Sequence, residues 1–296
     1  MSELSRNTDP AKIIAFQGEH GAYSDLACRM ARPEMTTLPC RTFEDAFAAV
    51  RDGDAALAMI PIENSVAGRV ADIHHLMPEN GLHIIGEHFQ RINHHLLAVP
   101  GTKLEDVTEV YSHVHALNQC RDFLKEHGIN PIVAVDTAGS AKEIAKSGDT
   151  TKAVIASELA GEIYGLTSLA ADIEDAEHNT TRFVVMSREA IVPHPKAGTP
   201  VTSFVFRVKN IPAALYKAMG GFATNGVNMT KLESYMIDGN FYATQFYADV
   251  EGHPENRNLR LALDELEFFS HEVKILGVYP PHPYRLEQKR AIEAEG

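Results

Sequence analysis

The stretch His178–Phe183 reads HNTTRF, and it places two hydroxyls, one amide and one guanidinium directly before the apolar run Phe183–Met186 (FVVM). Such a run is typical of a buried strand, so the polar side chains are expected at the start of a strand, where a fixed backbone can aim them into a cleft. Thr181 can donate one hydrogen bond and accept two, and Arg182 offers a planar fork of donors that suits a carboxylate. The alternative interpretation is a turn followed by a solvated arginine.

The composition is that of an ordinary globular protein. The chain has 296 residues, of which 44% are hydrophobic and 23% charged, and this length favours two domains. Its formal net charge of −13 disfavours nucleic acid and anionic membranes as partners, although local positive groups can still bind a small anion. The three scattered cysteines match a reducing environment. Because the N-terminal residues lack the apolar core of a signal peptide, and no apolar run reaches bilayer length, we expect a cytoplasmic protein.

A repeated pattern of strand, polar turn and helix organises the chain up to the HNTTRF stretch. The continuous run AALAMIPI at Ala55–Ile62 is typical of a strand covered on both faces, and open α/β sheets place ligand sites at the carboxyl ends of such strands. The chain has neither the GxGxxG nor the Walker spacing. Four histidines between Leu82 and Pro100 lack the HExxH metal spacing and are expected as strand and rim residues. We therefore expect no cofactor and no metal. Further strands are expected at Lys12–Phe16, Glu109–Ser112, Pro131–Val135 and Lys152–Ala156.

Glycines and hydroxyl-bearing residues at these turns are candidate ligands for a polar anion. A single one of them caps a helix, whereas several that face one cleft would bind an anion together with helix N-termini. Asn64 and Ser65 are expected to cap the helix that carries Ile73 and Leu76, and the segment HVHALNQCRDFLKEHG is expected to be one helix that a glycine ends. The candidates are Gly21, Tyr23, Ser24, Asn64, Ser65, Ser112, Thr137 and Ser157.

The pattern changes after a segment that holds prolines and a glycine, residues 189–200, which we interpret as a linker. Residues 201–281 follow the order β-α-β-β-α-β of the ferredoxin-like fold, with a hairpin turn at Asp238–Asn240 between the central strands. This segment has no nucleophile–base pair and no metal spacing, so it is expected to bind a ligand or to dimerise. Residues 282–296 are expected to be frayed or to form a short helix.

Several motifs, in this order, carry a resemblance to a known family: GEHGAYS, PIENSVAG, SHVHALNQC, DTAGSA, AVIAS and NTTRF. Through them nearly the whole chain resembles the prephenate dehydratases. The resemblance implies an α/β catalytic domain over residues 10–188, with two lobes like a type-2 periplasmic binding protein, and an ACT regulatory domain over residues 201–281. It implies the conversion of prephenate to phenylpyruvate in phenylalanine synthesis, without a cofactor.

By this resemblance Thr181 is the catalytic residue. The sequence departs from the family at Ser112–Leu117, where a Ser-His-Pro-Gln-Ala-Leu motif is usual. It also departs at Ala213–Leu215, where Gly-Ala-Leu is usual, and at Glu233–Met236, where Glu-Ser-Arg-Pro is usual. The resemblance places Asn64, Ser65, Thr180, Arg182 and Phe183 at the cleft. Its positions for the effector L-phenylalanine are Ala213, Ala214, Leu215, Asn228, Glu233 and Ser234.

Two other functions remain open at this stage. Arogenate, which has an amine in place of the keto group of prephenate, would undergo the same reaction. A non-catalytic protein that binds an amino acid would not need the NTTRF motif. Because ACT domains commonly pair edge to edge, a homodimer or homotetramer is expected in either case.

Overall fold

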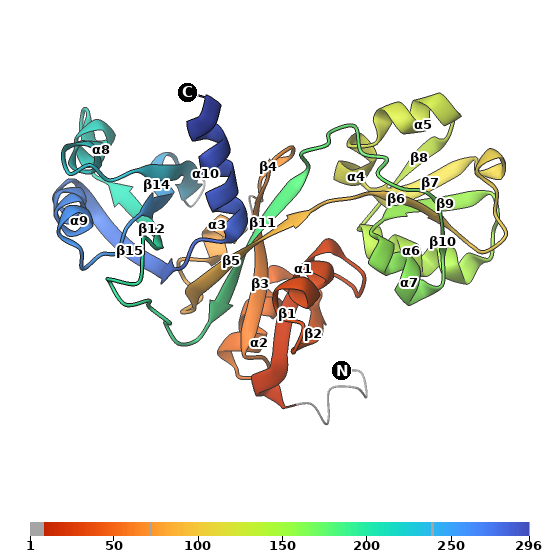
Figure 1. The fold of residues 1–296 in the computed structure, drawn as a ribbon, viewed down its shortest axis with the longest axis horizontal. Coiled ribbons are helices and arrows are strands. Elements are labelled where there is room, and N and C mark those ends of the chain that lie inside the picture. The colour runs from red at the N-terminus through yellow and green to blue at the C-terminus, as the bar shows by residue number, and fades with distance from the viewer. Residues whose placement is uncertain (1–8, 71–72, 238–239, 296) are drawn as a thin grey trace. The chain divides into compact units, whose positions relative to one another are not determined.

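The computed structural model describes residues 9–70, 73–237 and 240–295, and the chain forms two compact units of the α/β class (Figure 1). Unit 1 consists of Met1–Val70 and Phe89–Phe183, and unit 2 consists of Ala71–His88 and Val184–Gly296. Strands β5 (His83–Arg91) and β11 (Thr180–Ser187) each run from one unit into the other. Within the described residues, no helix combines the length and the apolar character needed to cross a bilayer.

The first sheet of unit 1 is built on the apolar runs that the sequence marks as strands. Its strand order is β2-β1-β3-β11, and β1 pairs in parallel with both β2 and β3. Ile14, Ala15 and Phe16 on β1 are fully buried, as expected for a central strand. The elements are β1 (Ile13–Gln17), α1 (Tyr23–Ala31), β2 (Thr36–Cys40), α2 (Phe43–Arg51) and β3 (Leu57–Asn64).

The segment after β3 differs from the expectation. Asn64 and Ser65 do not cap a helix, because the chain turns back into β4 (Gly68–Arg69), which pairs antiparallel with β3. The Asn64 carboxamide oxygen accepts hydrogen bonds from the backbone N–H groups of Val66 (2.9 Å) and Ala67 (2.8 Å). This local bonding stabilises a turn in place of a helix start. The short helix α3 (Ile73–Leu76) follows separately.

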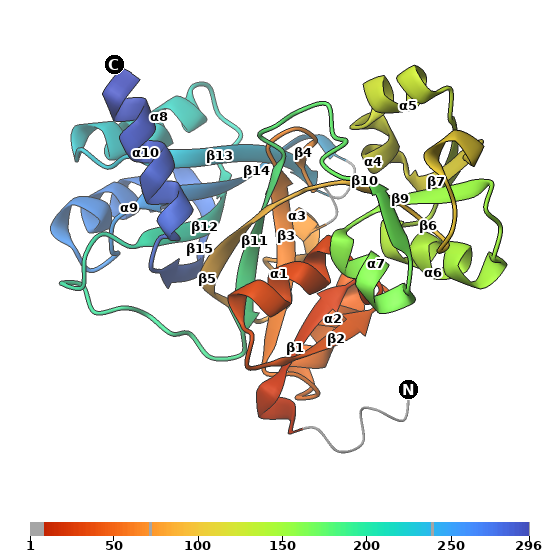
Figure 2. The same ribbon diagram turned by 45° about the vertical axis from the view of Figure 1, so that its right-hand side comes forward.

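The second sheet of unit 1 has the order β10-β6-β9-β7-β8 and carries helices on both faces (Figures 1 and 2). Helices α4 and α5 pack with buried residues of one face, including Val110 and Ile155, whereas α6 and α7 pack with the other, including Leu97 and Val154. The elements are β6 (His95–Ala98), β7 (Glu109–His113), α4 (Val114–Asn118), α5 (Arg121–His127), β8 (Asn130–Ala134), α6 (Thr137–Ser147), β9 (Lys152–Ala156), α7 (Glu158–Tyr164) and β10 (Thr167–Ala170).

The single helix expected after β7 is two helices. The break falls at Gln119 and Cys120, between α4 and α5. The Asp175 carboxylate accepts hydrogen bonds from the backbone N–H groups of Arg121 (3.1 Å) and Asp122 (3.2 Å). A carboxylate at these unpaired donors stabilises a new helix start, so the chain restarts as α5 and Gln119 is left at a bend.

Unit 2 shows the expected β-α-β-β-α-β order, with sheet order β13-β14-β12-β15-β5. Helices α8 and α9 lie side by side and cover one face, packing on Phe204, Phe206 and Phe246 (Figure 1). The predicted turn at Asp238–Asn240 falls largely on residues 238–239, which lie outside the described residues. The elements are β12 (Val201–Val208), α8 (Ala214–Thr224), β13 (Met229–Ile237), β14 (Asn240–Glu251), α9 (Arg257–Phe269), β15 (Ser270–Tyr279) and α10 (Pro283–Glu295).

The opposite face of this sheet is polar. Asp249 on β14 is fully buried and accepts a hydrogen bond from the Ser203 hydroxyl (2.5 Å). Helix α10 is fixed on this face by Arg285, whose Nε and Nη2 donate to the two carboxylate oxygens of Glu87 at 2.9 and 2.8 Å. The predicted tail is therefore a helix that is anchored by a buried ion pair.

Candidate functional site

Thr181 lies near the start of β11, and its side chain is half-buried. Its hydroxyl oxygen accepts a hydrogen bond from the Asn64 amide nitrogen at 3.0 Å. Two backbone donors hold the Asn64 oxygen, at 2.9 and 2.8 Å, and so they fix which end of the amide faces Thr181. Because Asn64 supplies the proton of this hydrogen bond, the Thr181 O–H is directed away from Asn64 and can be donated to another group.

A chain of side-chain hydrogen bonds continues from Asn64 across unit 1. The Asn64 amide also donates to the Asn179 oxygen at 2.8 Å, and the Asn179 nitrogen donates to the Gln119 oxygen at 3.1 Å. The same Gln119 oxygen lies 2.9 Å from Nε2 of His94, and Nδ1 of His94 lies 2.8 Å from the Tyr23 hydroxyl. The network therefore joins the Thr181 hydroxyl to Gln119, which follows α4, and to His94, which precedes β6.

Three members of this network are not among the residues singled out from the sequence: Gln119, Asn179 and His94. Gln119 lies at the unexpected break between α4 and α5. His94 is only 2% exposed, although it was expected at a strand or rim. Asn179 is fully buried and belongs to the HNTTRF stretch itself. Because a buried amide needs hydrogen-bond partners, an asparagine directly before a buried strand could have been predicted from the sequence to bond to other side chains.

The GEHGAYS loop is held by its own backbone and by the second sheet's helices. The Ser157 hydroxyl donates to the Gly21 carbonyl at 2.5 Å, and the Gly21 N–H donates to the Asp25 carboxylate at 2.9 Å. Burial raises the pKa of Asp25, but hydrogen bonds from His20, Arg29 and Gly21 outweigh this effect and lower the pKa to about 2. Ser157 and Gly21, both expected as substrate ligands, thus bond to each other.

Replacing Gly21 by alanine is expected to destabilise the protein by about 2–4 kcal/mol. A Cβ at this position would lie 2.8 Å from the Ala160 Cα, and such overpacking costs about 1–3 kcal/mol. The backbone φ of +88° adds about 1 kcal/mol for a residue with a side chain. Gly101→Ala is the matched control, because Gly101 has a φ of +90° with no atom within 4 Å of its Cβ position, and we expect a loss of about 1 kcal/mol there. Urea unfolding measures both, and equal losses would contradict the packing role.

The other predicted serines mainly satisfy backbone groups. The Ser65 hydroxyl donates to the His178 carbonyl at 2.6 Å and accepts from the Thr180 N–H at 2.9 Å, so it holds the start of β11. Ser112 is fully buried and donates to the Ile155 carbonyl at 2.6 Å. Two candidates lie in the first turns of helices and are half-buried, Ser24 in α1 and Thr137 in α6.

Arg182 differs most from its expected position. Successive residues of a strand point to opposite faces, and so Arg182 does not share the face of Thr181. Its guanidinium is 3% exposed and donates to the Glu63 carboxylate at 2.9 Å. The chain itself therefore supplies a carboxylate to Arg182, and Phe183 beside it is part of the buried core.

The residues expected to bind an effector all lie in unit 2. Ala213 adopts a left-handed φ of 61° before α8, a conformation that favours the glycine usual in the family motif. Asn228 donates to the Glu251 carboxylate at 3.1 Å, and Glu233 pairs with Lys231 at 3.3 Å. The remaining three are Ala214, which is buried, Leu215, which packs on the apolar core, and Ser234, which is exposed.

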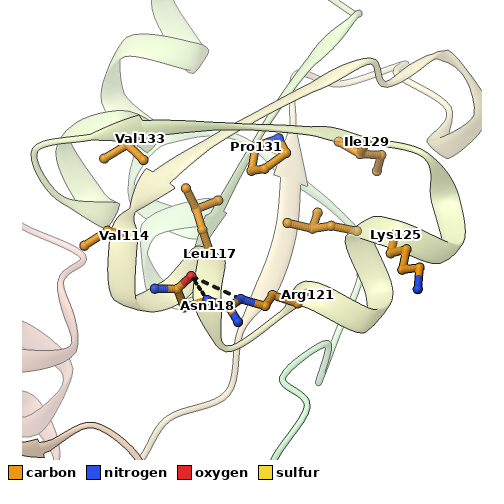
Figure 3. Close-up of a pocket in the computed structure, with 9 residues that line it drawn as sticks. Val114, Leu117, Asn118, Arg121, Lys125, Ile129, Pro131 and Val133 are labelled. Carbon is orange, nitrogen blue, oxygen red and sulfur yellow. Dashed lines mark hydrogen bonds between the residues drawn. The ribbon is translucent and has the colours of Figure 1, made fainter.

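A cavity of about 310 Å³ lies between α4, α5 and β8 (Figure 3). Its lining is largely apolar, with Leu117 and Ile129 among its residues, and Arg121 reaches its edge, where it bonds to the Asn118 side-chain oxygen. None of the network residues lines this cavity.

Comparison with known proteins identifies the family. Residues 14–191 match the prephenate dehydratase family model. The chain is 56% identical over 275 residues to a bifunctional N-acyl-homoserine lactone acylase/prephenate dehydratase of Komagataeibacter europaeus, covering 93% of this chain and 98% of the relative. It is 39% identical over 295 residues to the chloroplastic arogenate dehydratase/prephenate dehydratase 1 of Arabidopsis thaliana, covering 94% and 75%.

Solved structures agree with these matches. The prephenate dehydratase of Arthrobacter aurescens in complex with L-Phe superposes with a TM-score of 0.83 at 30% identity, over 90% of each chain. Both the sequence and the fold of this chain are therefore those of one group of enzymes. The chain belongs to the prephenate dehydratase family, whose members are lyases.

Proposed function

We propose that this chain converts prephenate to phenylpyruvate, carbon dioxide and water, with Thr181 as the donor to the departing hydroxyl. The observation that carries the proposal is the hydrogen bond from the Asn64 amide to the Thr181 oxygen at 3.0 Å. It fixes Thr181 as a donor toward any group placed against it, and family membership supplies the reaction class.

The departing hydroxyl oxygen is the atom whose developing charge the enzyme has to stabilise. Loss of carbon dioxide sends an electron pair through the ring and expels hydroxide from the opposite carbon, and the ring becomes aromatic. Hydroxide is a poor leaving group, so a donor aimed at its oxygen lowers the barrier. Threonine is a very weak acid, and we therefore assign Thr181 a hydrogen bond that strengthens in the transition state rather than a full proton transfer. Donation from Asn64 polarises the Thr181 O–H and strengthens that bond.

One substrate carboxylate is assigned to the N-terminus of α1 rather than to Arg182. The first turn of α1 carries Ser24 and has no side-chain cap, so backbone N–H groups there suit an anion. The first turn of α6 carries Thr137, but the Asp136 carboxylate already accepts from the Gly139 N–H at 2.5 Å there. We assign Arg182 to holding Glu63 in place of a substrate carboxylate, because its buried guanidinium donates to Glu63 at 2.9 Å. Gly21, Ser65, Ser112 and Ser157 support the site by holding the backbone around it.

Prephenate is proposed over arogenate as the preferred substrate, since the 56% identical relative is named for prephenate. The test is to incubate the purified protein with each compound at equal concentrations and to follow phenylpyruvate by its ultraviolet absorbance and phenylalanine by chromatography. Phenylpyruvate formed faster from prephenate is the expected result. Faster formation of phenylalanine from arogenate would reverse the substrate assignment. No product from either would favour a non-catalytic amino-acid-binding protein.

We further propose that residues 201–281 act as an ACT domain that binds L-phenylalanine and lowers activity, in a homodimer or homotetramer. The β-α-β-β-α-β order of unit 2 and the relative crystallised with L-Phe support this proposal. Ala213, Asn228, Glu233 and Ser234 are the proposed contacts. Calorimetry with L-phenylalanine is expected to show binding, and an absence of both heat and inhibition would contradict it.

A further inference from the structure

We propose that Tyr23 and His94 are positioning residues, which fix the Gln119 amide so that its amino group is presented to the substrate as a hydrogen-bond donor. The inference rests on the proposed function, because it assigns how the same network prepares a second donor besides Thr181. It follows from counting protons along the hydrogen bonds, starting from the backbone.

The Asn64 oxygen is fixed by two backbone N–H donors. Its nitrogen must then be the donor to the Asn179 oxygen at 2.8 Å. The other end of the Asn179 amide is therefore a nitrogen, and it donates to the Gln119 oxygen at 3.1 Å. Each amide in this series has one orientation that satisfies its neighbours, and the series ends with an oxygen of Gln119 facing Asn179.

The same oxygen faces His94 Nε2 at 2.9 Å, so this ring nitrogen must carry a hydrogen. Burial lowers the pKa of His94, and in the neutral ring the other nitrogen, Nδ1, is then an acceptor. The Tyr23 hydroxyl lies 2.8 Å from Nδ1 and is the donor available to this nitrogen. The pKa of Tyr23 is raised well above its ordinary value, first by burial and then by Cys120 and Glu174, so the hydroxyl stays protonated. Tyr23 thus selects the Nε2–H tautomer.

Other charged groups around His94 are consistent with this assignment. The Glu174 carboxylate accepts a hydrogen bond from the His94 backbone N–H at 2.8 Å, and it is paired with Arg91 at 3.0 Å. His95 follows directly in the chain. The Tyr23 hydroxyl also donates to the Asn93 carbonyl at 2.7 Å, so its single proton is shared between that carbonyl and Nδ1, and the tautomer is sensitive to any change at Tyr23.

The consequence falls on Gln119. Two donors occupy its oxygen, so its amino group is turned away from both, and the residue is half-exposed. A flipped amide would set its N–H groups against two other donors and leave each of these groups unsatisfied. His94, held by Tyr23, therefore adds a second donor to the Gln119 oxygen and strengthens the orientation that Asn179 sets, in which Gln119 offers a donor to the substrate.

The test compares Tyr23→Phe with Tyr111→Phe, since Tyr111 bonds only outside the network, to Glu109 at 2.8 Å. Tyr23→Phe keeps the ring that packs edge-on against His94 at 5.5 Å and removes only the hydroxyl. We expect kcat to fall about tenfold, the effect of one lost hydrogen bond, with little change in Tm. The ring 15N NMR shifts of His94 should show the Nε2–H tautomer in the parent and a loss of that preference in Tyr23→Phe, while Tyr111→Phe changes neither property.

A double-mutant cycle shows whether Tyr23 acts through Gln119. Gln119→Glu keeps the shape of the side chain and replaces its amino group by a carboxylate oxygen, so Tyr23→Phe should lower kcat no further in that background. Unchanged kinetics in Tyr23→Phe, or an additive double mutant, would overturn the positioning role. If the parent protein turned over neither prephenate nor arogenate, the proposed function would fail, and the NMR comparison alone would decide whether Tyr23 sets the tautomer. An unchanged tautomer in Tyr23→Phe would then refute the inference.

Discussion

Thr181→Val is expected to lower kcat for the dehydration by about a hundredfold to a thousandfold, which is the usual cost of removing one donor to a developing oxyanion. Valine keeps the shape of threonine and its preference for strands, and it loses only the hydroxyl that Asn64 orients at 3.0 Å. The loss should appear in kcat more than in KM, because the hydrogen bond strengthens in the transition state. Steady-state kinetics with prephenate measures both parameters.

The control for this prediction is Thr181→Ser, which restores the hydroxyl and should recover most of the lost rate. Circular dichroism and a thermal melt should show that both variants are folded. Asn64 would lose one hydrogen-bond acceptor in Thr181→Val, yet its contacts with Asn179, Val66 and Ala67 remain. A Thr181→Val protein with near-normal kcat would remove Thr181 from the mechanism.

Arg285→Leu is expected to destabilise unit 2 by about 3–5 kcal/mol, the usual effect of leaving a buried charge without its partner. The Glu87 side chain is 0% exposed and receives two hydrogen bonds from Arg285, at 2.9 and 2.8 Å. The fully buried Asp249 carboxylate lies 3.9 Å from the same guanidinium. Leucine would leave both carboxylates without this cation. Urea unfolding, followed by circular dichroism, measures the loss.

Two comparisons isolate the effect of the buried charge. Lys289→Ala removes the exposed ion pair with Glu251 on the same helix (2.9 Å), and we expect a loss of at most about 1 kcal/mol. Combining Arg285→Leu with Glu87→Gln removes one uncompensated charge and should recover part of the lost stability. If Arg285→Leu were no more harmful than Lys289→Ala, the buried pair would not anchor α10.

The sequence predicts the strands and most helices well because their signals are local. β1 and β9 lie on the continuous apolar runs that predict them. Thr181 could also be placed at the start of a strand, because the apolar run after it marks the strand. Arg182 directly follows Thr181 in this strand, and successive side chains of a strand point to opposite faces. The sequence therefore also predicts that Arg182 and Thr181 point in opposite directions.

The missed features depend on partners that are distant in the chain. The break at Gln119 depends on Asp175, which caps α5 from more than fifty residues away. His94 is buried by contacts with Tyr23 and Gln119. No pattern of residues near His94 in the sequence predicts a buried histidine of this kind. Asn64 is a residue type that is common at helix starts, but its side chain bonds to Asn179 and Thr181, more than a hundred residues away, and the chain turns into β4. Local propensity gave way to tertiary contacts in each case.

The two strands that cross between the units restrict how this protein can be divided. Residues 71–88 belong to unit 2, and β5 meets β15 so closely that a Cβ at Gly277 would lie 2.1 Å from the Ile84 carbonyl oxygen. A gene fragment that stopped in the linker would leave β5 without β15, and it would expose the apolar side chains of this segment. Recombination that exchanges residues 201–281 must therefore bring along a matching β5. The two units share the chain of β5 and of β11, and so neither can be replaced without the strand segment that belongs to the other.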